Sequence, residues 1–190
     1  MRVLVACEYS GTVREAFAKR GHDAWSCDLL SDESQCDEIP NHIQIDFTLL
    51  SKDFLQSFDL LIGHPPCTYF SLLNNFMKGR EEGRAKALAF FINMYNSPIE
   101  QICLENPVGL LSSLFKKPTQ IIQPWHFGHP YTKATGLWLK NLPNLKHINP
   151  YFGKTTMFAF ANKAAPTWKE RSKTFQGIAN AMASQWGEFL

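Results

Sequence analysis

The stretch RVLVACEYSGTVREAFAKRGHDAWSCDLL, residues 2–30, decides the fold. Its first six residues form an apolar run that is typical of a buried strand. Residues 11–21 place Val13, Ala16 and Phe17 at helical spacing, and Gly21 ends that helix. Residues 23–30 return to a strand pattern, so the stretch predicts two parallel strands joined by a crossover helix.

The same alternation continues along the chain. Strand patterns lie at residues 42–47, 59–63 and 99–107, and predicted helices at residues 51–58 and 79–95 separate them. Ser51 is the expected N-cap of the first of these helices. Strands that alternate with helices predict an α/β fold with a mostly parallel, doubly wound sheet.

The pattern changes after residue 114. Residues 118–143 indicate strands interrupted by Pro and Gly, and residues 144–168 indicate a loop with one strand near residues 156–160. Residues 171–190 predict a single closing helix. Because no repeat or linker interrupts the sequence, we expect residues 1–190 to form one domain.

Composition limits the function classes. The chain has 190 residues, a formal net charge of +2 and a pI near 8.3, which permit a nucleic-acid partner without requiring one. No apolar run approaches the roughly 20 residues of a membrane span, and no signal segment opens the sequence, so we expect a cytoplasmic protein.

The five cysteines include no C-x-x-C pair, so neither disulfides nor a metal site is predicted. His126 and His129 are expected to be incidental loop residues.

Polar residues follow each predicted parallel strand, at the edge where an open sheet of this kind binds ligands. They are Cys7-Glu8-Tyr9-Ser10-Gly11, Asp28, Asp46, residues 63–71 and Glu105-Asn106-Pro107. The first of these segments is a turn of small residues, Asp28 could bind ribose hydroxyls, and Asp46 adds a further acid. This combination predicts a site for a cofactor that carries a nucleoside. Each acid taken singly is also typical of a helix cap or a solvated turn.

Cys67 follows the fourth strand in the segment DLLIGHPPCTYFS, residues 59–71. Backbone N–H groups at such a strand end stabilise a thiolate and make it a better nucleophile. A lone cysteine is more often a small core residue. Here, however, Pro65 and Pro66 fix the preceding backbone, and Glu105 ends the neighbouring strand. A nucleophile beside an acid predicts covalent catalysis.

These motifs resemble those of the DNA (cytosine-5)-methyltransferases. PPCTYFS, residues 65–71, is similar to the family's Pro-Cys-x-x-Phe-Ser motif, and LENP, residues 104–107, to its Glu-Asn-Val motif. EYSGTV, residues 8–13, stands at the place of its cofactor loop, and GIANAM, residues 177–182, is similar to its C-terminal segment. The resemblance follows the whole chain in order and is closest to small phage-borne members that lack a target-recognition domain. It implies a Rossmann-like class I methyltransferase fold.

The resemblance also implies a chemistry and a set of site residues. In the family, the cysteine thiolate adds to C6 of a flipped cytosine, the glutamate assists at N3, and C5 takes a methyl group from S-adenosylmethionine. Cys67 is the implied nucleophile and Glu105 the implied acid. The residues implied to bind the cofactor are Glu8, Tyr9, Ser10, Gly11, Asp28, Asp46, Pro65 and Asn180. The residues implied to contact the substrate, expected to be DNA, are Pro66, Ser71, Asn106, Pro107, Tyr131 and Lys133.

The sequence departs from the family at three places. The family's cofactor loop is richer in glycine than Ser10-Gly11-Thr12-Val13. Tyr131, Lys133 and Thr135 stand where the family has Gln-x-Arg-x-Arg, so one arginine becomes lysine and the other is lost. Residues 140–169 are too few for a separate target-recognition domain, which predicts low sequence specificity or specificity supplied by a partner.

Several alternatives remain open from the sequence. The same chemistry could act on RNA or on a free cytidine nucleotide. A catalytically silent nucleic-acid-binding protein is a second alternative, and a methyltransferase that acts on exocyclic amines is a third. The third fits less well, because His64 and Cys67 occupy the ends of the motif in which that class has an amine acceptor and an aromatic ring. Lys78, Arg80 and Arg84 are candidate phosphate contacts.

Overall fold

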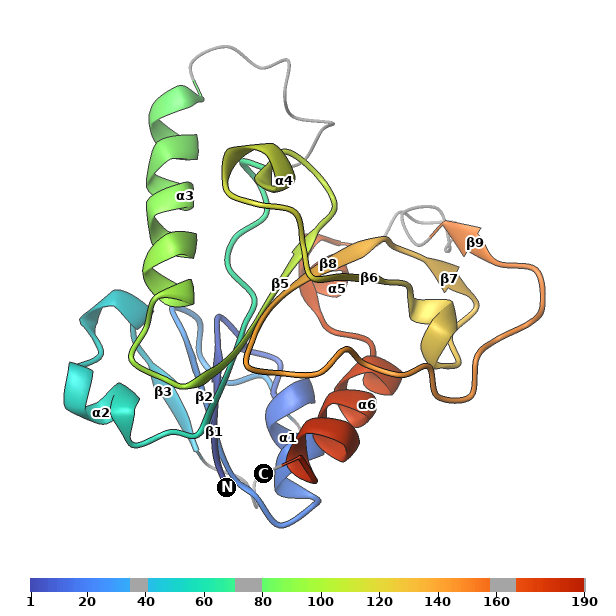
Figure 1. Cartoon of the computed structure of the whole chain (residues 1–190), viewed down its shortest axis with the longest axis horizontal. Coiled ribbons are helices and arrows are strands. Elements are labelled where there is room, and N and C mark those ends of the chain that lie inside the picture. The colour runs from blue at the N-terminus through green and yellow to red at the C-terminus, as the bar shows by residue number, and fades with distance from the viewer. Residues whose placement is uncertain (35–40, 71–79, 158–166, 190) are drawn as a thin grey trace.

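A seven-stranded sheet forms the centre of the computed structural model, which describes residues 1–34, 41–70, 80–157 and 167–189 (Figure 1). The strand order is β3-β2-β1-β4-β5-β8-β6. The strands that pair in parallel are β1 (Arg2–Ala6), β2 (Asp23–Asp28), β3 (His42–Gln44), β4 (Leu60–Gly63) and β5 (Gln101–Pro107). Strand β8 (Thr135–Lys140) is antiparallel both to β5 and to β6 (Gln120–Ile122). The mostly parallel sheet predicted from the sequence is therefore confirmed.

Helices cover both faces of this sheet. Helices α1 (Thr12–Ala18) and α6 (Gln176–Gly187) pack side by side on one face (Figure 1). The opposite face carries η1 (Phe47–Leu49), α2 (Lys52–Gln56) and α3 (Glu81–Tyr95). The shorter elements are α4 (Leu111–Leu114), η3 (Pro124–Phe127), α5 (Trp168–Ser172) and a small parallel sheet of β7 (Tyr131–Thr132) with β9 (Thr156–Met157). The result is the Rossmann-like, doubly wound arrangement that the sequence predicts.

The sheet separates two hydrophobic cores, because successive side chains of a strand point to opposite faces. Val3 and Val5 of β1 belong to the core under α1 and α6. Leu4 and Ala6 belong to the core under α3. All four are completely buried, which explains why β1 appears in the sequence as a continuous apolar run.

Two predicted elements differ from the structure. The third strand ends at Gln44, because the Asp46 carboxylate accepts a hydrogen bond from Thr48 N at 2.8 Å and begins η1. The single closing helix is wrong: α5 ends at Ser172, and α6 begins at Gln176 after an extended Phe175. The predicted N-cap of α2 is confirmed, since Ser51 accepts a hydrogen bond from Phe54 N.

Strand register places the site. Strands β4 and β5 are parallel neighbours in which Gly63 is opposite Leu104. The residue after β4, His64, therefore lies beside Glu105 of β5, which stays in the sheet through its pairing with Leu137 of β8. In the described part of the chain, no helix has the length and apolar character needed to cross a membrane.

Candidate active site

The centre of the site is a buried contact between His64 and Glu105. Nδ1 of His64 lies 2.9 Å from Oε2 of Glu105, and each side chain is only 12% exposed. The hydroxyl of Thr174 donates a second, longer hydrogen bond of 3.4 Å to the same carboxylate oxygen. We call the first two residues the His64–Glu105 pair.

The pair shifts the pKa values of both members. Burial would lower the pKa of His64, but the hydrogen bond and charge of Glu105, with the charge of Glu8, raise it above its ordinary value. Burial would likewise raise the pKa of Glu105, but the hydrogen bond and charge of His64, with the charge of Lys133, lower it. Both pKa shifts favour the charged forms, an imidazolium that donates its Nδ1 proton to a carboxylate.

The loop that carries Cys67 is fixed to β5 and the segment after it. Nδ2 of the buried Asn106 donates a 2.9 Å hydrogen bond to the carbonyl of Pro65. Leu110 N donates a 2.9 Å bond to the carbonyl of Phe70, whose ring is buried. Between these anchors, Cys67 is exposed, and its carbonyl accepts a bond from Phe70 N. The thiol is therefore accessible on a loop whose ends are held.

The other described cysteines are poor nucleophiles. Burial and the charge of Glu105 raise the pKa of Cys103 well above its usual value, and burial raises the pKa of Cys27 to about 12. Burial and the charges of Cys27, Asp28 and Asp46 also raise the pKa of Cys7, a half-buried residue just after β1. Cys36 lies outside the described residues. Among the described thiols, only Cys67 is exposed.

A cavity of about 410 Å³ lies at the carboxyl edge beside this loop. Asp28 and Asp46, which follow neighbouring strands, line it together with Pro66, the residue before Cys67. Phe47 and Phe90 add an apolar wall, with their ring centroids 6.3 Å apart in an edge-to-face contact. The volume is within the range of small-molecule sites, and the lining combines aromatic side chains with two carboxylates. These residues fit the adenosine part of a nucleoside-bearing cofactor.

The turn after β1 is built by internal contacts. The carboxylate of Glu8, which is 4% exposed, accepts hydrogen bonds from Val13 N at 2.6 Å and Arg14 N at 3.1 Å, at the start of α1. Gly11 is the N-cap of that helix and has a φ of 70°, where a side chain would be strained. Ser10 bonds to the Thr12 hydroxyl at 3.1 Å. None of these predicted cofactor residues is among those lining the cavity.

A segment from the C-terminal part of the chain packs across this turn. The Tyr9 hydroxyl donates a hydrogen bond to the carbonyl of Lys169 at 2.9 Å. Nζ of Lys133 donates a 2.8 Å hydrogen bond to the carbonyl of Arg171. Together with the bond from Thr174 to Glu105, these contacts place residues 169–174 against the predicted cofactor turn and the His64–Glu105 pair.

The remaining predicted residues are distributed around the site. Lys133 lies near enough for its charge to act on both members of the His64–Glu105 pair, whereas Tyr131 packs against Phe175 at 5.9 Å between ring centroids.

Pro107 ends β5, and Pro65 is held by Asn106. Asn180 is exposed on α6 and accepts a hydrogen bond from Gln176. Ser71 and Lys78 lie outside the described residues.

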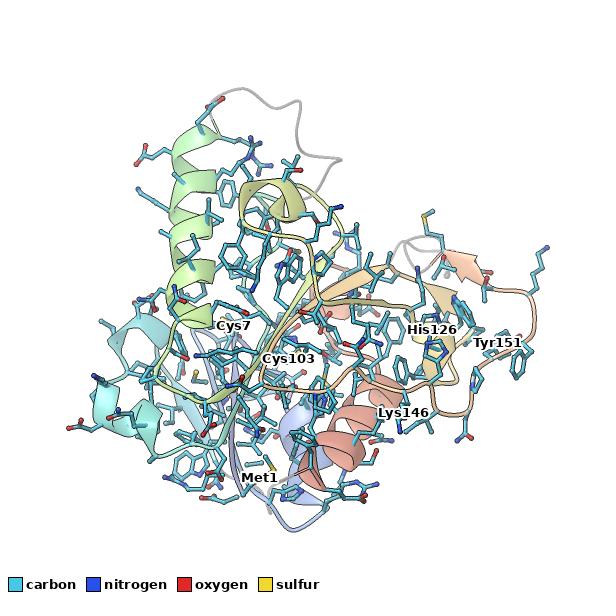
Figure 2. The ribbon with its side chains drawn as sticks, viewed as in Figure 1. Met1, Cys7, Cys103, His126, Lys146 and Tyr151 are labelled. Carbon is cyan, nitrogen blue, oxygen red and sulfur yellow. The ribbon has the colours of Figure 1, made fainter. Side chains whose placement is uncertain are left out.

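The two histidines of the HFGH segment lie on η3 and just after it. Figure 2 shows His126 in the lobe that also carries Tyr151, well away from Cys7. His126 stacks on His147 with centroids 3.8 Å apart, and His129 Nε2 accepts a hydrogen bond from Gly177 N. The described residues contain no group of three side chains able to hold a metal ion.

Sequence reasoning missed the role of His64. Its partner is 41 residues away along the chain, and only the pairing of β4 with β5 brings the two together. One signal was present: His64 and Glu105 each follow directly after a predicted buried run, on strands expected to be neighbours.

Comparisons with known proteins identify the fold. No protein-family model and no curated protein matches the sequence. The structure is similar to a putative DNA modification methyltransferase of an E. coli prophage, with 16% identity, 87% of this chain and 55% of that chain covered, and a TM-score of 0.52. It is also similar to the S. pombe Dnmt2 methyltransferase, at 16% sequence identity and a TM-score of 0.55. This match covers 91% of this chain and 58% of that chain. A third similar structure is the Entamoeba histolytica methyltransferase EhMeth, at 14% sequence identity and a TM-score of 0.52. This match covers 88% of this chain and 61% of that chain.

This chain spans between 55% and 61% of the length of those three structures. At 14–16% identity, the similarity establishes a shared architecture. The chain therefore has the Rossmann-like fold of solved methyltransferases.

Proposed function

We propose that this protein transfers a methyl group from S-adenosylmethionine to C5 of cytosine in DNA. The observation that carries the proposal is the cavity that runs from Asp28 and Asp46 to Pro66, directly beside the exposed Cys67. This arrangement puts a nucleoside-sized site next to an accessible thiol, with a buried carboxylate on the adjoining strand. The DNA substrate is supported by the similar prophage structure, which is described as a putative DNA modification methyltransferase.

The cofactor would lie in the cavity with its ribose near Asp28 and its adenine against Phe47 and Phe90. When bound, it supplies an electrophilic methyl group. The protein contributes carboxylates that accept hydrogen bonds from sugar hydroxyls. It also contributes apolar walls that exclude water at the carboxyl ends of β1 and β2.

Cys67 and Glu105 would act on the base. The Cys67 thiolate attacks C6, which makes C5 electron-rich, and Glu105 faces N3, where a proton is needed as negative charge develops. Asn106 keeps the Pro65 carbonyl, and hence the loop before Cys67, in a fixed position. Elimination of the thiolate after loss of the C5 proton releases the methylated base.

The test is a mass-spectrometric survey of nucleosides from DNA, RNA and the nucleotide pool of cells that express the protein. We expect 5-methyldeoxycytidine in DNA, and bisulfite sequencing should place it in many sequence contexts or in a very short motif. Expression of Cys67→Ser should abolish the product, whereas Cys103→Ala, which changes a buried thiol, should retain it. Methylated cytidine in RNA or in free nucleotides would move the assignment to that substrate. No methylated cytosine in any pool would overturn the proposed chemistry.

A further inference from the structure

His64 has a buried nitrogen that the fold leaves without a partner. Nδ1 donates to Glu105 at 2.9 Å, but Nε2 is buried and forms no hydrogen bond with any described residue. An unpaired polar atom of this kind costs free energy, so histidine is an expensive choice if it serves only to fill space. We propose that His64 is a positioning residue that holds a proton on the His64–Glu105 pair for delivery to N3 of the target cytosine. This inference rests on the proposed function.

The charges around His64 favour a stored proton. Glu105 faces it from β5, and Glu8 faces it from the turn after β1, so two carboxylates stabilise the imidazolium. Lys133, between β7 and β8, opposes them but does not outweigh them. With these contacts the pKa of His64 is raised, so the pair stays protonated above the ordinary imidazole value of about 6.5.

Glu105 by itself is a poor proton donor. Its pKa is lowered by the hydrogen bond and charge of His64 despite the opposing effect of burial, so near neutral pH the carboxyl group is ionised. A carboxylate accepts hydrogen bonds and has no proton to give. The proton required at N3 must therefore come from a group that Glu105 contacts, and of His64 and Thr174 the imidazolium is by far the stronger acid.

The Cys67 sulfur forms a bond to C6, the C5=C6 electron pair becomes the C4=C5 bond, and the C4=N3 pair takes a proton at N3. That proton comes from Glu105, which receives the Nδ1 proton of His64 in the same step. The thiolate and the imidazolium are thereby replaced by a neutral adduct and a neutral imidazole. After methyl transfer, water removes the C5 proton, the thiolate leaves, and N3 returns its proton to the pair.

A matched pair of variants separates proton storage from hydrogen bonding. In His64→Asn the amide nitrogen occupies the position of Nδ1, so it can still donate to Glu105 but cannot release a proton to it. Thr174→Val removes the other hydrogen bond to the same carboxylate oxygen and leaves the imidazole in place. The measurement is the single-turnover rate of methyl transfer between pH 6 and 10, with binding of S-adenosylhomocysteine as the check on folding.

In the parent protein we expect the rate to fall as the pH rises through the raised pKa of His64. Thr174→Val should keep this alkaline decline. His64→Asn should lose it and should react about 10²–10⁴-fold more slowly at neutral pH, the usual contribution of general acid catalysis. A His64→Asn protein with the parent rate and the parent alkaline decline would overturn the inference.

A second measurement is independent of the variants. An NMR titration of the His64 imidazole in the parent protein should give a midpoint above 6.5, and a midpoint below that value would also overturn the inference. If the parent protein itself forms no methylated cytosine, the proposed function fails. If the parent is active and His64→Asn behaves identically, only the role of His64 fails.

Discussion

Replacement of Asn106 by alanine should loosen the catalytic loop without disturbing the cofactor cavity. The side chain is 1% exposed, and its Nδ2 donates the 2.9 Å hydrogen bond that holds the Pro65 carbonyl. Loss of such a donor leaves a buried carbonyl unpaired and costs about 1–3 kcal/mol. Because Oδ1 of Asn106 has no partner among the described residues, its removal offsets part of that cost. We therefore expect the free energy of unfolding to fall by about 1–2 kcal/mol.

The effect on reaction should be larger than the effect on stability. Cys67 follows Pro65 by two residues, and a displacement of about 1 Å at a reacting atom can cost 10²-fold in rate. Urea unfolding gives the first quantity, and the rate of covalent trapping by a cytosine fluorinated at C5 gives the second. Gln120→Ala is the matched control, since its amide also donates a 2.8 Å hydrogen bond to a carbonyl, that of Leu145, and it lies on β6, which β8 separates from β5. An Asn106→Ala protein that loses no more trapping rate than this control would refute the reasoning.

Two further predictions concern the cavity and the thiols. Asp28→Ala should weaken binding of S-adenosylhomocysteine by about 1.5–3 kcal/mol in calorimetry, the value of a hydrogen bond to a charged group, whereas Asp23→Ala at the opposite end of β2 should not. Equal losses in the two variants would exclude the proposed cofactor site. Peptide mapping after brief iodoacetamide treatment should show Cys67 labelled well before Cys103, because Cys67 is exposed and burial raises the pKa of Cys103. Simultaneous labelling would contradict the burial described here.

The parallel sheet could be predicted from the sequence because its strands are buried on both faces. Runs such as Leu60-Leu61-Ile62 have no polar residue to accommodate, so periodicity and length are enough to identify them. The break between α5 and α6 was harder to predict, because residues 171–190 are helix-compatible throughout. The decisive local signal was Thr167 followed by Glu170, a capping box that starts a separate short helix.

The candidate site was predictable only where it depends on strand ends. Asp28, Asp46 and Cys67 each lie at or near the carboxyl end of a strand, so topology alone brings them to one edge. The contact between His64 and Glu105 depends on side-chain direction and on burial, which the sequence does not specify. The sequence likewise does not show that the Glu8 carboxylate accepts hydrogen bonds from the backbone at the start of α1, where a contact to the cofactor was expected.

The central claim, that Cys67 attacks C6 of cytosine, is tested most directly by covalent trapping. DNA that contains 5-fluorocytosine should be methylated but cannot lose its C5 substituent as a proton, so enzyme and DNA stay joined. With S-adenosylmethionine, we expect a complex that survives denaturing electrophoresis, and it should be absent in Cys67→Ser, whose hydroxyl is a far weaker nucleophile. A Cys67→Ser protein that traps the substrate, or methylates cytosine as fast as the parent, would contradict the account.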